Sequence, residues 1–293
     1  MTDEPASERT VASAVLHTLF AGEPTPFDER DNVIAATSQR WQQMGPKAKF
    51  SEGHGPINGL PDGRVLEVVG HMAALGEQLG LALTCSRDAH RWLTEKATSI
   101  GRPLGARALA EMTGYYVLSA SHGLANITLR ALLIGKPIRP LVDAAFPAAK
   151  GFPPFSEERD AWKSLSPFVV TKLSDVADQA GVPAAVDLVA VLSTLSGDSR
   201  WKALDARRGV DFHRWRPQSI TGGVAAKNPW TAQPDGSRTM SVGMLSDYVP
   251  PEPGLLVAEA DDALDALHEA MTVWADQFPT ATRDLGVALF KTT

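Results

Sequence analysis

The stretch VLEVVGHMAALGEQLGLAL, residues 65–83, decides the fold, because its apolar residues recur every three or four positions. That spacing places them on one face of a helix with about 3.6 residues per turn. The members of this face are Val65, Val68, Val69, Met72, Leu75, Leu79 and Leu83. The pattern predicts a helix over 65–98, and Gly101 and Pro103 are residues that end one.

The rest of the chain predicts more helices. A second long helix is expected over 104–134, closed by Gly135-Lys136-Pro137. Two long helices with a short connection favour an antiparallel pair, the start of a bundle. Further helical patterns cover 7–20, 28–44, 157–180, 183–196, 199–216 and 255–278. The predicted fold class is therefore all-α, a multi-helix bundle with long antiparallel helices.

Gly and Pro interrupt these patterns in two places. Residues 45–63 predict a loop, which separates N-terminal helices and linker over 1–60 from a helical bundle over 61–293. The two parts can equally form one continuous domain. A long Gly/Pro-rich loop is expected over about 217–254, with a short strand at 239–245. Loops of this length are commonly functional or disordered.

Composition limits the classes of protein. Apolar residues make up 44% of the 293 residues and the formal net charge is -6, so nucleic acid can bind only at a local basic patch. The single cysteine, Cys85, cannot form a disulfide within the chain, which fits a reducing cytoplasm. The N-terminus is acidic and no apolar run reaches the length of a membrane span, so we expect a cytoplasmic protein that contacts no membrane. We also expect no metal and no other cofactor, since no two histidines have a ligand spacing on one helix face.

A basic cluster stands out against this acidic background. Residues 200–216 hold six cations and two acids, with His213 among them. Arginine presents a planar fork of donors suited to phosphate, and histidine exchanges a proton near neutral pH. Arg214 and Arg216 are candidate substrate-binding residues. Together an arginine and a histidine supply the chemistry of metal-free phosphodiester cleavage.

Spacing within the cluster constrains how it can work. Arg208 and His213 are five residues apart, about 140° around a helix, so they meet at one phosphate only across a groove or with copies from a second subunit. Arg207 and Asp211 are four apart and share a face. Asp211 can therefore orient an arginine or neutralise it.

The spacing Arg208-x4-His213, equally Arg207-x5-His213, resembles the R-x(4–6)-H signature of the HEPN superfamily. Members are all-helical bundles, and many are metal-independent endoribonucleases that act as dimers. The resemblance implies that Arg208 or Arg207 and His213 form the catalytic pair, that Asp211 assists, that RNA is the partner, and that the protein is a homodimer of a defence or toxin system. The residue after the arginine, often polar in that family, is Gly209 here.

A non-catalytic alternative explains the same arginines. The helix expected at the C-terminus carries acids that can pair with them, and a helical scaffold would use the basic segment in this way or to bind a protein partner. These acids are Glu259, Asp261, Asp262, Asp265, Glu269 and Asp276.

The helix over 104–134 also carries a polar ladder. Ser119, His122, Asn126 and Arg130 follow one another at spacings of three and four, so they lie on one face. Such a ladder either faces solvent, lies in the core with its hydrogen bonds satisfied, or lines a cleft. In the last case His122, Asn126 and Arg130 are candidate substrate-binding residues opposite His213.

Overall fold

The structure, a computed structural model, describes most of the chain in eight segments. These are residues 26–47, 64–94, 101–135, 138–147, 162–213, 230–232, 238–240 and 252–286. Their helices are α2 (Glu29–Lys47), α3 (Arg64–Thr94), α4 (Gly101–Ile134), α5 (Arg139–Ala145), α6 (Pro167–Ala180), α7 (Pro183–Gly197), α8 (Ser199–His213) and α9 (Pro253–Asp284). The prediction of an all-α bundle is confirmed.

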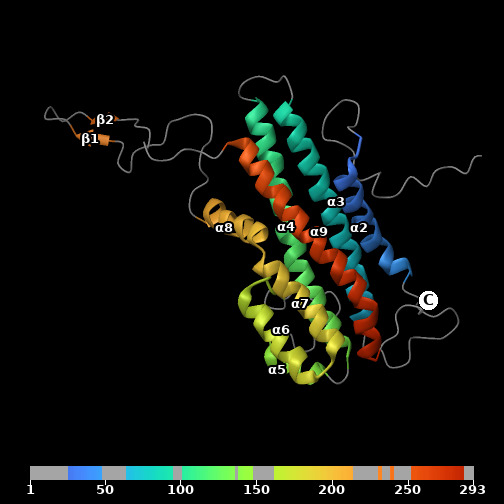
Figure 1. Ribbon diagram of the computed structural model, residues 1–293. Helices are drawn as coiled ribbons and strands as arrows, with labels where there is room; N and C mark the ends of the chain where they lie inside the picture. The colour runs from blue at the N-terminus through green and yellow to red at the C-terminus, as the bar shows by residue number, and fades with distance from the viewer. Residues whose placement is uncertain are drawn as a thin grey trace, which may run out of the picture.

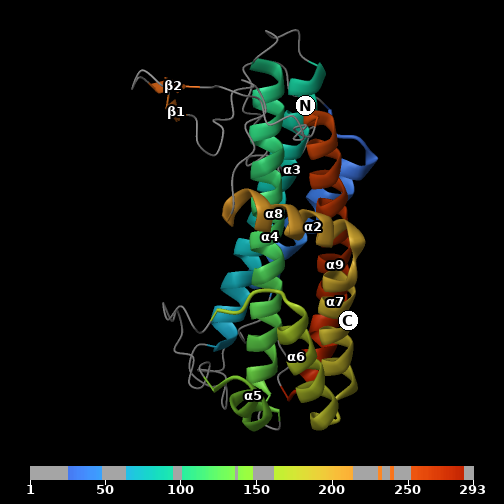
Figure 2. The ribbon, with the colours of Figure 1, turned by 90° about the vertical axis from the view of Figure 1, so that its left-hand side faces the viewer.

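Three long helices form the body of the molecule. α3, α4 and α9 run side by side, with α2 against α3 and α9 (Figure 1). α5, α6 and α7 gather at one end, and α8 lies across α4 and α9 (Figure 2). α2 contributes Ile34, Trp41 and Met44 to the main hydrophobic core, so this helix and the bundle share one core.

Aromatic residues fix the centre of that core. The ring of Trp274 stacks on Phe278 with centroids 4.6 Å apart and lies 5.1 Å from Trp41. Both indoles are fully buried, and each N–H finds an acceptor: Trp41 donates to the Met271 carbonyl and Trp274 to Thr128 Oγ1. Buried tryptophan therefore contributes apolar area without leaving a donor unsatisfied.

Local sequence signals explain several helix ends. Ser166 caps α6 by accepting from the Val169 N–H, and Pro167 occupies the first turn. Asp198 Oδ1 accepts from the Arg200 N–H at the start of α8, as a capping side chain does. Gly181 ends α6 with φ of 64°, a backbone conformation that favours glycine.

Some sequence predictions are corrected. The helix predicted from 157 begins only at Pro167, because the residue before a proline prefers extended backbone and Ser166 adopts it. α5 lies between the helices predicted over 104–134 and 157–180, where no helix was predicted. The strand expected at 239–245 is Arg238–Met240 (β2), and it pairs antiparallel with Trp230–Ala232 (β1), which was not predicted. The helix expected at 7–20 lies outside the described residues.

α4 is also longer and more apolar than expected, since no apolar run of the length of a membrane span was predicted. By length and composition Leu104–Ile134 could cross a membrane, yet 83% of its most apolar window is buried inside the protein. The core helix of a helical bundle has this same character.

Candidate functional site

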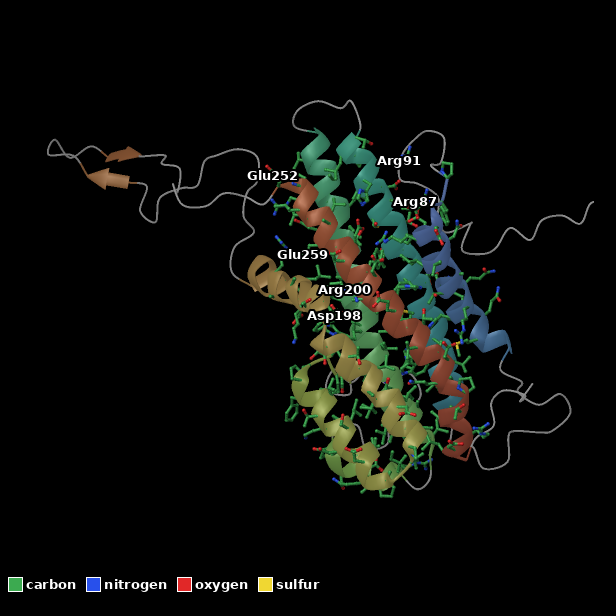
Figure 3. The ribbon with its side chains drawn as sticks, viewed as in Figure 1. Arg87, Arg91, Asp198, Arg200, Glu252 and Glu259 are labelled. Carbon is green, nitrogen blue, oxygen red and sulfur yellow. The ribbon has the colours of Figure 1, made fainter. Side chains whose placement is uncertain are left out.

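The basic cluster divides between two faces of α8. Arg200 and Arg207 face α9: Arg200 binds Glu269 there as well as Asp198 before α8, and Nε and Nη2 of Arg207 bind the two oxygens of the Glu259 carboxylate. Figure 3 labels Arg200 and Asp198 at the start of α8 and Glu259 on α9. Hydrogen bonds from Arg200 lower the pKa of Glu269 below its usual range. The pairing expected between the basic segment and the C-terminal helix is therefore present, and Arg207, a predicted catalytic residue, is engaged by it.

Arg208 points to a different partner. Its exposed side chain reaches α4, where Nη1 lies 3.2 Å from Nε2 of His122. Consecutive residues on a helix are about 100° apart, so Arg207 and Arg208 necessarily face different neighbours. The structure thus joins the basic cluster to the polar ladder.

The remaining cluster residues are less fully described. α8 is continuous from Ser199 to His213, so Arg208 and His213 belong to one helix and do not share a face. The side chains of Asp211 and His213, and all of Arg214 and Arg216, lie outside the described residues. Their roles remain sequence predictions.

His122 opens onto a pocket of about 350 Å³, which we call the histidine pocket. Helix α3 supplies one wall, α4 a second, and the segment just before α6 a third; Figure 2 shows that segment crossing beside α4. The lining residues are His71, Ala74, Leu75, Gln78, Ser119, His122, Gly123, Asn126, Trp162, Lys163 and Ser164. No acidic side chain is among the described residues that line it.

The two ring nitrogens of His122 both face N–H donors. The Leu165 backbone N–H donates to Nδ1 at 3.0 Å, and Arg208 lies at Nε2. A neutral imidazole accepts at only one nitrogen, and an imidazolium at neither. Burial, followed by the charge of Arg208, lowers the pKa of His122, which favours the neutral ring.

With Nδ1 accepting from Leu165, the proton of neutral His122 sits on Nε2. Two donors, Nε2–H and the Arg208 guanidinium, then lie side by side, with Nε2 and Nη1 3.2 Å apart and no acceptor between them among the described residues. An oxyanion placed there would accept from both. The arrangement is chemically suited to a phosphate or carboxylate group of a ligand.

The other ladder residues hold the third wall in place. The Asn126 amide donates to the carbonyls of His122 and Lys163 and accepts from the Lys163 N–H at 2.9 Å. The Arg130 guanidinium, only 2% exposed, stacks over the Trp162 ring at 4.5 Å. Asn126 and Arg130 thus hold the third wall in place, and Asn126 also lines the pocket together with Ser119 and His122.

Two parts of the pocket were missed by sequence analysis. Residues 162–164 fell within a predicted helix, although Pro167 is a signal that extended backbone precedes it. His71 is a polar residue inside the apolar stretch 65–83, and it contacts Trp162 edge to face at 5.1 Å. Gln78 lies two turns after His71 on α3, and its Oε1 is buried and accepts no hydrogen bond from any described residue.

Among the described residues, no group of three or more His, Cys, Asp or Glu side chains is arranged to hold a metal ion. Comparison of the chain with protein-family models, with curated proteins and with solved structures found no match.

Proposed function

We propose that this protein is a metal-independent endoribonuclease whose histidine pocket binds the scissile phosphodiester. The observation that carries the proposal is the close pair of donors, His122 Nε2–H and Arg208, beside a pocket whose described lining residues include no acid. Such donors stabilise the negative charge on the non-bridging oxygens of the pentacoordinate phosphorus that forms during the reaction. The buried acceptor of Gln78 suits the hydroxyl of a ribose.

The reaction needs one further group to move protons. A base removes the proton of the ribose 2′-hydroxyl, the 2′-oxygen attacks phosphorus, and the bond from phosphorus to the 5′-oxygen breaks. The protonated base then gives this proton to the leaving 5′-oxygen, so the products are a 2′,3′-cyclic phosphate and a 5′-hydroxyl. His71 lines the pocket and His213 follows Arg208 on α8, and either imidazole is chemically suited to this transfer.

The test is cleavage of a labelled single-stranded RNA in the presence of a chelator. His122→Asn is the informative variant, because the Asn side chain can still accept from Leu165 N–H but lacks the Nε2 donor. We expect His122→Asn and Arg208→Ala each to lower the cleavage rate about a hundredfold, since one such donor contributes roughly 3 kcal/mol in other enzymes. His71→Ala and His213→Ala identify the proton-transfer group.

His268→Gln is the matched control, since His268 is half-buried on α9 and its Nε2 lies within hydrogen-bonding distance of Thr37 Oγ1. All variants must keep the wild-type melting temperature for the comparison to count. Cleavage by both His122→Asn and Arg208→Ala at the wild-type rate would refute the proposal. The homodimer implied by the HEPN resemblance is measured on the same samples by light scattering.

A non-catalytic scaffold is the second candidate. The ion pairs of Arg200 and Arg207 with α9 favour it, because they use these arginines to hold α8 in place. A scaffold would show no RNA cleavage and would keep its partners after His122→Asn. It would lose them when α8 is released by Arg207→Glu, and regain them in the double variant Arg207→Glu with Glu259→Arg.

A further inference from the structure

We propose that a second pocket, between α5 and α6, is a stacking subsite for a nucleobase of the RNA strand whose phosphate lies at His122. This inference rests on the proposed function for its choice of ligand. The second pocket, here called the aromatic pocket, has a volume of about 330 Å³. Its lining residues are Ala145, Phe146, Pro147, Trp162, Lys163, Ser164, Ser166, Phe168, Val169 and Lys172.

The two pockets adjoin. Trp162, Lys163 and Ser164 line both, so the segment before α6 is the wall between them. A ligand longer than one nucleotide can therefore cross this wall without leaving the surface. Asn126 fixes the wall through the Lys163 backbone, which keeps the two pockets in a constant relation.

Exposed aromatic rings mark the aromatic pocket. Phe168 is 67% exposed and Trp162 is 42% exposed, although burying a ring of this size contributes about 2 kcal/mol. The Lys172 ammonium lies over the Phe168 ring at 4.6 Å and donates to the Ala145 carbonyl, which holds both side chains in place. An ordered ring with a large exposed area is a platform on which a base can stack.

Electrostatics favours a nucleic acid strand over an acidic or neutral peptide. None of the described residues that line the two pockets is acidic, whereas the groove along α2 is lined by Asp28 and Glu29. Lys163 and Lys172 lie on the proposed path, in a chain whose net charge is -6. Aromatic rings alternating with cations are the recurring features of proteins that bind single strands.

The experiment measures binding of a labelled single-stranded oligoribonucleotide by fluorescence anisotropy, and binding of inorganic phosphate by calorimetry. Phe168→Ala should weaken oligonucleotide binding at least about fivefold, because one stacked base contributes 1–3 kcal/mol. Phe168→Tyr, which keeps the ring, should bind like wild type. Leu255→Ala removes a similarly exposed side chain, 62% exposed on α9, and serves as the matched control.

The outcomes separate the subsite from the proposed function. His122→Asn should weaken phosphate binding, and Phe168→Ala should not. If Phe168→Ala weakens RNA binding while His122→Asn affects neither RNA nor phosphate, the subsite stands and the catalytic proposal fails. Equal RNA affinities for Phe168→Ala and Leu255→Ala, or no RNA binding by wild type, would overturn the subsite.

Discussion

Replacing Asn126 tests how the bundle holds its histidine pocket. The Asn126 side chain is 2% exposed and makes three hydrogen bonds, two to the Lys163 backbone and one to the His122 carbonyl. Each contributes about 1 kcal/mol net, and the better helix propensity of alanine offsets about 0.5 kcal/mol. Asn126→Ala should therefore lower the free energy of unfolding by about 2.5 kcal/mol and loosen residues 162–165.

The Asp variant refines the same test. Asn126→Asp keeps an acceptor for the Lys163 N–H, but its second oxygen faces two carbonyl oxygens and cannot donate when ionised. Protonation restores one donor, so the folded state raises the pKa of the new carboxyl. The destabilisation relative to wild type should then shrink as the pH falls toward 4.

Urea denaturation gives the free energies, and hydrogen exchange at the Lys163 and Leu165 amides reports on the wall itself. Both amides should exchange faster in Asn126→Ala. A loss below about 0.5 kcal/mol, together with unchanged exchange at Lys163, would show that Asn126 does not position the wall.

Three further predictions concern the bundle. A Cβ at Gly76 would lie 2.7 Å from a backbone oxygen of α2, so Gly76→Ala should lower the free energy of unfolding in urea by about 1–3 kcal/mol. A Cβ at Gly70 meets nothing within 4 Å, so Gly70→Ala should raise it by about 0.5–1 kcal/mol. The hydrogen bond to Asp261 raises the pKa of His90. The stability advantage of wild type over His90→Gln should therefore be full below about pH 6.5 and vanish as the pH rises through the raised pKa of His90. An advantage that grows with pH would contradict this. Burial raises the pKa of the Cys85 thiol to about 11, so a thiol reagent at pH 8 should label it only as fast as the protein opens, and rapid labelling of the native protein would disprove its burial.

Helix periodicity predicted the body of the fold because the packing follows that periodicity. α3 begins and ends within four residues of its predicted limits, and α4 within three. Two errors at helix ends involve a proline within or beside a helical pattern. Pro167 delays the start of α6, while Pro279 lies within α9 and does not end it at 278. A proline thus marks a boundary only where the preceding residue is free to become extended.

The candidate site shows the limit of spacing arguments. The sequence pattern paired Arg208 with His213, five residues later. Helical geometry already required that any histidine in contact with Arg208 come from another helix or subunit. That histidine is His122 of the polar ladder. Neither the ladder nor the basic cluster indicated that His122 and Arg208, 86 residues apart in the sequence, would meet. The packing of α8 on α9 and across α4 brings them together, and at α4 the buried Trp201 of α8 donates to Ser121. Removing that anchor by Trp201→Phe should therefore weaken phosphate binding although the tryptophan is absent from the pocket, and unchanged phosphate affinity would mean that Arg208 reaches His122 without it.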